Sequence, residues 1–178
     1  MKGITFIILC ISLHITAQIS PNINQYNKQG KKHGIWKGYH ENTQTKRYEG
    51  EFNHGTPVGR FTYYAIEGHV SGIVDFINDS ISSAQMFHDN GSIMAEGKFL
   101  NQTKSGKWYI YSRSGYLLNV LHYLNGALEG TQYSYYPKFD DYEKVKVMEQ
   151  YECAGGLKNG VWKEFHKLGT VKAQGNYV

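Results

Sequence analysis

Apolar and polar residues alternate along short stretches over most of this chain. Between residues 91 and 99, for example, every second residue is apolar or small: Ile93, Ala95, Gly97 and Phe99. Alternation with a period of two places one set of side chains on one face of a β-strand. No stretch of useful length has the spacing of an amphipathic helix. The pattern therefore predicts an all-β protein.

A longer pattern repeats along the chain. A glycine is followed two residues later by a large aromatic residue and five residues later by Tyr or Phe. The gap between Gly59 and Gly106 is twice the usual step, so we place a degenerate copy there, starting at Ser83. The steps between the first residues of successive copies are then 25, 24, 23, 24 and 30. The six copies are Gly34-Trp36-Tyr39, Gly59-Phe61-Tyr64, Ser83-Gln85-His88, Gly106-Trp108-Tyr111, Gly130-Gln132-Tyr135 and Gly160-Trp162-Phe165.

Turn residues separate the alternating runs. The segments Asn53-His54-Gly55, Asn125-Gly126 and Gly155-Gly156 contain residues that accept a positive φ angle. Each unit is therefore predicted to be a β-hairpin, and successive hairpins are predicted to form an antiparallel meander. The expected architecture is an elongated single-layer sheet of about six stacked hairpins.

The residues also predict how neighbouring strands pair. We expect large side chains to face small ones across the hairpins, because close packing requires each position to be filled. In two degenerate copies the glycine is replaced by Val74 or Leu121 and the facing aromatic residue by Gln85 or Gln132, so the larger apolar side chain lies on the other strand. One pair, Tyr151 with Trp162, departs from the rule. The other expected pairs are Tyr48 with Tyr63, Gly50 with Phe61, Phe52 with Gly59, Gly97 with Trp108, Phe99 with Gly106, Val74 with Gln85 and Leu121 with Gln132.

The unit resembles a known repeat. Residues 48–59, YEGEFNHGTPVG, resemble a MORN repeat, and the pattern G-x-x-x-G-x-aromatic-x-x-Tyr is similar to the variant form of that repeat found in exported bacterial proteins. The resemblance covers residues 29–178 in about six copies, and it implies a sheet of stacked hairpins. The positions expected to be structural are Gly34, Trp36, Gly50, Gly59, Phe61, Gly97, Gly106, Trp108, Gly130, Gly160 and Trp162.

The N-terminus has the features of an export signal. A positive start is followed by an apolar run from residue 4 to 15 and by small residues ending at Ala17. We predict a signal peptide at 1–17 that is cleaved after Ala17, and hence a secreted or periplasmic protein; the alternative is a buried first helix or strand. Residues 18–28 are predicted to be a polar linker, and residues 29–178 the repeat domain, with an insertion near 137–144.

Composition and net charge limit the kinds of structure and partner that we expect. Aromatic residues make up 15% of the chain, and 20 glycines accompany only 3 prolines, which is typical of folded strands and turns. The formal net charge is only +4 and is scattered, so nucleic acid is not an expected partner. After cleavage Cys153 is the remaining cysteine. It occupies the place of Phe52 and Phe99 in the repeat, which predicts a buried core residue.

The sequence contains one candidate binding surface. We call the first residue of each copy its anchor. The residue five positions after an anchor is an odd number of positions from the packed aromatic residue, so on a regular strand it points to the other face. These residues are expected to form a stripe there. A stripe of rings offers a large contact area at a low cost in entropy. The alternative is a structural role, in which the rings cover the second face or a bulge turns them inward. The stripe residues are Tyr39, Tyr64, His88, Tyr111, Tyr135 and Phe165.

The sequence offers little for catalysis. It has no G-x-S-x-G elbow and no phosphate-binding loop that leads into a helix. The histidines lack the spacing of a zinc site, and the acidic residues Asp140, Asp141 and Glu143 are best explained as a solvated loop. We therefore expect no enzyme activity, no cofactor and no metal.

These features together predict an exported MORN-like protein that acts as a protein-interaction or scaffold module at the cell envelope. The alternative is a module that binds lipid headgroups or glycans. Two further alternatives are an antitoxin-like protein, which an export signal argues against, and a hydrolase with an unrecognised site. The last run, residues 170–177, has no following strand to pair with, so we also expect self-association through this edge.

Overall fold

The computed structural model describes residues 22–137 and 146–178. This part of the chain contains 14 strands and no helix. The strands are β1 (Gln25–Tyr26), β2 (Lys32–Tyr39), β3 (Lys46–Asn53), β4 (Thr56–Tyr64), β5 (Val70–Phe76), β6 (Ile81–Phe87), β7 (Ile93–Leu100), β8 (Thr103–Tyr111), β9 (Leu117–Leu124), β10 (Ala127–Leu128), β11 (Gly130–Tyr135), β12 (Val147–Ala154), β13 (Leu157–Phe165) and β14 (Val171–Tyr177).

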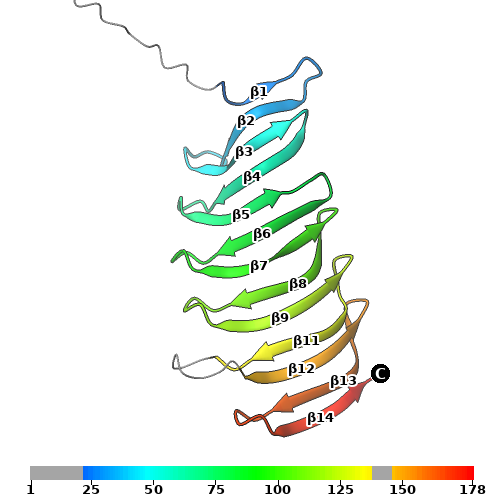
Figure 1. The fold of residues 1–178 in the computed structure, drawn as a ribbon. Coiled ribbons are helices and arrows are strands. Elements are labelled where there is room, and N and C mark those ends of the chain that lie inside the picture. Colours follow the sequence, from blue (N-terminus) through cyan, green and yellow to red (C-terminus); the bar gives the residue numbers. More distant parts are fainter. Residues whose placement is uncertain (1–21, 138–145) are drawn as a thin grey trace, which may run out of the picture.

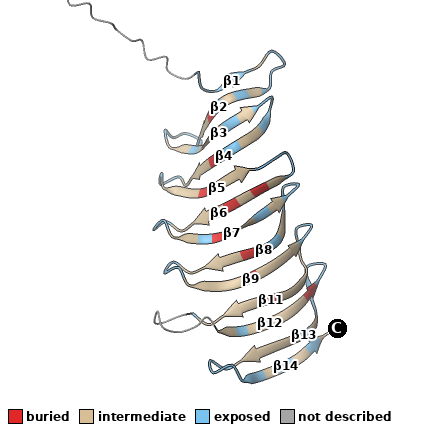
Figure 2. Cartoon of the chain, in the orientation of Figure 1, coloured by how far each residue is buried: buried red, intermediate tan, exposed pale blue. Residues whose placement is uncertain are grey.

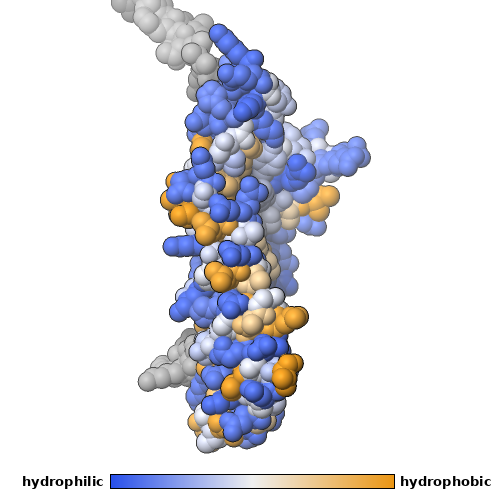
Figure 3. Space-filling view, turned by 90° about the vertical axis from the view of Figure 1, so that its right-hand side faces the viewer, coloured by the Kyte–Doolittle hydropathy of each residue, from blue (hydrophilic) through white to orange (hydrophobic). Residues whose placement is uncertain are grey.

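All strands belong to one antiparallel sheet whose order follows the sequence. The path runs from β1 to β14, and only the short β10 lies off it, paired with β9. The result is an elongated single layer of stacked hairpins (Figure 1). Seen from the side of the β3–β4 and β7–β8 turns, the molecule is narrow (Figure 3). The predicted all-β meander is therefore confirmed.

The core is a thin layer on one face of the sheet. Trp36, Phe61 and Trp108 are buried there, and Trp108 is fully inaccessible to solvent. The rings pack edge to face, with 5.1 Å between the centroids of Phe99 and Trp108. Buried positions recur along the sheet from β2 to β12 (Figure 2). We call this side the aromatic face, and the other side the opposite face.

Two glycines on the aromatic face make room for rings from the next strand, as predicted. A Cβ atom at Gly50 would lie 2.5 Å from the ring of Phe61, and one at Gly97 would overlap the indole of Trp108. Tyr48 pairs with Tyr63, and Tyr151 pairs with Trp162, also as expected. The rule that large faces small therefore holds at Gly50 and Gly97, while the two other pairs join large residues.

The anchor glycines serve the backbone and not the packing, which corrects two predicted pairs. Phe52 faces Pro57, and Phe99 faces Lys104, so neither faces an anchor glycine. Between the pairs Glu49–Thr62 and Glu51–Val58, two steps along β3 span four along β4. Gly59 lies in this bulge with a φ of 64°, a conformation that glycine adopts without the Cβ penalty. Gly34, Gly106, Gly130 and Gly160 also have positive φ.

The degenerate copy is shifted by one residue, so the predicted Val74–Gln85 pair is wrong. Ser83 forms no bulge, and β5 and β6 pair without a register shift. Val74 consequently faces Ala84, which is buried in the core beside Trp108, while Gln85 faces Ile73 on the opposite face.

Gln132 is fully buried, and its side chain makes hydrogen bonds to the backbone where the pairing between β9 and β11 is interrupted. Its side-chain oxygen accepts the backbone N–H of His122 at 2.7 Å, and its amide nitrogen donates to the carbonyl of Gly130 at 2.9 Å. The ladder itself contains the pairs Val120–Tyr133 and Asn119–Ser134. Leu121 and Gln132 are the next residues in this register, but no direct pair forms there.

The predicted linker contributes to the fold at its end. Gln25 and Tyr26 form β1, and the carbonyl of Gln25 accepts the indole N–H of Trp36 at 3.1 Å. The side chain of Asn24 exchanges hydrogen bonds with the backbone of Lys37. The predicted signal peptide at 1–17 and residues 138–144 of the predicted insertion lie outside the described residues.

Two further predictions concern the C-terminal hairpins. Cys153 is buried, with 4% of its surface exposed, as its place in the repeat predicted. Strand β14 pairs with β13 on one side and has no partner strand on its other side within the described residues. Self-association through this edge stays a prediction.

Candidate functional site

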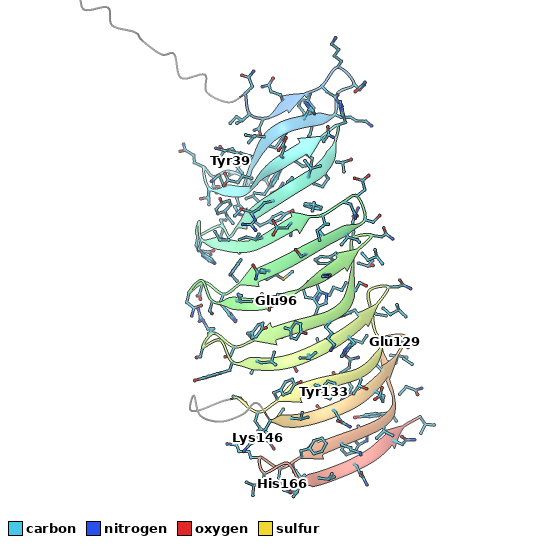
Figure 4. The ribbon with its side chains drawn as sticks, in the orientation of Figure 1. Tyr39, Glu96, Glu129, Tyr133, Lys146 and His166 are labelled. Atoms are coloured by element: carbon cyan, nitrogen blue, oxygen red, sulfur yellow. The ribbon has the colours of Figure 1, made fainter. Side chains whose placement is uncertain are left out.

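The opposite face carries rows of side chains that run across the strands. One row consists of residues that pair directly across β4 to β8: Thr62, Ile73, Gln85, Glu96 and Tyr109. Glu96 lies near the middle of the sheet (Figure 4). The next row along the same strands is Arg60, Asp75, Ser83, Lys98 and Ser105. The candidate site consists of these two rows and the strand ends beside them.

The structure brings five of the six predicted stripe residues to one long edge. They are the last residues of alternate strands, and a one-residue register shift comes directly before each of them. Strands two apart in a sheet lie about 9.6 Å from each other. Tyr39 marks the first of these strand ends in Figure 4. The five residues are Tyr39, Tyr64, Tyr111, Tyr135 and Phe165.

His88 does not occupy the sixth position. It follows the end of β6, and Phe87 has the register position that Tyr64 and Tyr111 have in their strands. The cause is the missing glycine bulge at Ser83, which shortens the spacing by one residue. The replacement of glycine by serine at this anchor was the signal that could have revealed the shift.

The hydroxyls of two stripe tyrosines are held by glutamates of the preceding strand. Tyr64 donates to Glu49 at 2.5 Å, and Tyr111 donates to Glu96 at 2.9 Å. Lys46 also donates to Glu49 at 2.9 Å, and its ammonium lies 4.5 Å from the centre of the Tyr64 ring. The hydrogen bond from Tyr64, followed by that from Lys46, lowers the pKa of Glu49. These contacts fix the two rings against the opposite face.

Tyr111 gives a pH-dependent test of this arrangement. Burial, followed by the hydrogen bond to Glu96, raises its pKa from 10.0 to about 12. Because the folded state favours the neutral phenol, this contribution to stability is complete below pH 10.0 and is lost as the pH rises towards about 12. Tyr111→Phe should cost about 0.5–1.5 kcal/mol at neutral pH through the lost hydrogen bond. It should also reduce the fall in unfolding free energy in the alkaline range, measured by urea titration. An unchanged alkaline profile would contradict the assignment.

Backbone groups at the same edge tie successive hairpins together. The imidazoles of His40 and His88 make hydrogen bonds with the carbonyls of Tyr64 and Tyr111, at 3.0 and 3.1 Å. Further along, the hydroxyl of Tyr136 donates to the carbonyl of Phe165 at 2.7 Å. His88 therefore supports the stripe through the backbone of its neighbour.

A groove lies beside the stripe, over β5 to β8 on the opposite face. Its volume is about 560 Å³, and Ala84, Gly97 and Gly106 contribute to its floor. Its walls include Ile73, Tyr109, Lys98 and Lys107. Ser83 and Ser105 have short side chains between taller neighbours, which leaves the space open. A groove of this volume is within the range of ligand-binding pockets.

Within residues 22–137 and 146–178, no three His, Cys, Asp or Glu side chains are grouped so that they can hold a metal ion. The same part of the chain has no helix with the length and apolar character needed to cross a membrane.

The fold and the site define an open, single-layer β-hairpin repeat protein. Its last hairpin, residues 158–178, matches the model of the family described as MORN repeat variant. The match covers β13 from Lys158 onward and all of β14, and it includes Trp162, whose indole lies over Gly175. The resemblance inferred from the sequence is thus confirmed on this segment. The family consists of repeats, often in binding roles, and is not an enzyme family. No curated protein matches the chain.

Proposed function

We propose that this protein is a protein-interaction or scaffold module exported to the cell envelope. The observation that carries the proposal is the row of strand-end rings, which recurs on alternate strands along one edge of the sheet. A repeated ring contact on a rigid scaffold suits an extended partner, because each ring adds contact area and loses little entropy. Tyr39 is the most accessible example, with 47% of its surface exposed.

The matched family supports a binding role, and the predicted signal peptide supports export. Three stripe residues are held in place by hydrogen bonds: Tyr64 and Tyr111 through their hydroxyls, and Phe165 through its backbone carbonyl. Such support pre-organises a binding surface, and pre-organisation reduces the cost of association.

The double variant Tyr64→Ala with Tyr111→Ala tests the proposal. We expect it to remain folded, because neither ring belongs to the core cluster around Trp108, and to lose a partner that the unchanged protein captures from envelope fractions. Folding would be checked by circular dichroism and capture by quantitative mass spectrometry. Tyr26→Ala is the control, since Tyr26 is exposed in β1, away from the stripe.

Two results would contradict the proposal. Unfolding of the double variant would show that the rings are structural, and capture at the level of the unchanged protein would show that they do not bind. A Tyr26→Ala variant that loses the same partner would also count against the stripe.

The second candidate function is binding of lipid headgroups or glycans. The groove over β5 to β8 favours it, because this space has the volume of a small-molecule site and contains polar side chains. The matched family leaves both candidates open.

A further inference from the structure

The groove over β5 to β8 has an unequal supply of hydrogen-bonding groups. Its acceptors are occupied: Arg60 binds both carboxylate oxygens of Asp75 at 2.8 and 2.9 Å, and Glu96 accepts from Tyr111 and from Gln85 at 2.9 and 3.1 Å. The groove therefore presents two carboxylates that already have partners.

Gln85 aside, four donor side chains of the groove are free of partners among the described residues. Across the described residues, the ammonium groups of Lys98 and Lys107 take part in no hydrogen bond and no ion pair, and the hydroxyls of Ser83 and Ser105 are likewise unused. With Arg60, which pairs with Asp75, the side chains of the groove carry three positive and two negative charges, and both free cations are lysines. An excess of free donors with a small positive net charge is complementary to a ligand rich in acceptors and negative charge. The ring of Tyr109 lies in the same groove and offers an apolar contact.

The spacing of these donors distinguishes a sugar chain from a peptide. Ser83, Lys98 and Ser105 are direct partners on three adjacent strands, so a chain laid across the sheet meets one of them about every 4.8 Å. A linear chain of pyranose rings advances by a similar length per residue. An extended peptide places side chains on one face only about every 6.7 Å. The peptide also finds no free backbone partner here, since the central strands are paired on both sides.

We infer that the groove binds a segment of acidic polysaccharide, with uronate-type carboxylates at Lys98 and Lys107 and sugar hydroxyls at Ser83 and Ser105. This deepens the second candidate function and does not depend on a protein partner. The test below changes lysines in the groove, and the capture test changes rings at strand ends, so either can fail without the other.

The inference predicts that oligogalacturonate binds the intact protein, with an affinity that falls as salt is added. Replacing both lysines, Lys98→Gln with Lys107→Gln, should weaken binding about tenfold or more, because two charge-assisted contacts are lost. Lys163→Gln is the matched control: Lys163 lies on the same face in β13, outside the groove, and should change binding by less than about twofold. Isothermal titration calorimetry at low salt measures all three.

A second variant tests the open space of the groove separately from its positive charge. Ser105→Phe keeps both lysines but fills the space between them, and it should also abolish binding. Wild-type affinity in this variant would overturn the inference, as would equal losses in the Lys163→Gln control. Equally tight binding of a neutral oligosaccharide, of polyglutamate or of vesicles containing phosphatidylserine would overturn it as well, since each replaces the acidic sugar chain by another ligand.

Discussion

Replacing Trp108 with alanine is expected to lower the free energy of unfolding by about 3–5 kcal/mol, the range for large aromatic residues in a core. Trp108 has no exposed surface, and its indole N–H donates to the carbonyl of Lys98 at 3.1 Å. It also packs against Ala84 and Ala95 and lies 4.6 Å below the ammonium of Lys104. The substitution removes all of these contacts at the centre of the array.

The control is Trp36→Ala, which removes the same side chain near the end of the array. In a repeat protein each unit is stabilised mainly by its neighbours, so a defect in the middle breaks two interfaces, while a defect at β2 leaves β3 to β14 intact. Urea unfolding followed by far-UV circular dichroism should therefore show a loss of signal over the whole sheet for Trp108→Ala and a smaller, local loss for Trp36→Ala. Equal effects would contradict this picture of the core.

Gly97→Ala is expected to destabilise the protein by about 1–3 kcal/mol, the usual cost of overpacking. The added methyl group would overlap the indole of Trp108, which is enclosed and has no room to move away. Thermal unfolding would show the change as a lower Tm.

Gly72→Ala is the matched control for this effect. Gly72 is likewise a strand glycine and is itself buried, but a Cβ there would lie 3.5 Å from the carbonyl oxygen of Gln85, which is an ordinary contact. The control should be neutral or stabilising by about 0.4–1 kcal/mol, because alanine restricts the unfolded chain. If both variants lose stability equally, the cost comes from the loss of glycine itself and not from the ring of Trp108.

The stripe shows where inference from the sequence reached its limit. Parity along a strand predicted correctly that Tyr64 and Tyr111 lie on the face opposite Phe61 and Trp108, since their hydroxyls meet Glu49 and Glu96 there. His88 was misplaced because a fixed count from Ser83 assumed a bulge like the one at Gly59, whereas the strand is regular at Ser83. Whether the stripe binds a partner stays a prediction.

The groove could not have been predicted from the sequence. Its residues come from four strands, and only the register places Ser83 beside Lys98 and Lys98 beside Ser105. Nothing in the spacing of Arg60 and Asp75 indicates that they neutralise each other.

The sequence alone determined that this protein is a meander of hairpins with rings over glycines, because strand alternation and turn chemistry are local properties of the chain. Only the tertiary structure decided which donors remain free on the opposite face and how bulges shift each copy. These depend on contacts between strands, and a single inserted or missing bulge residue changes every contact that follows it.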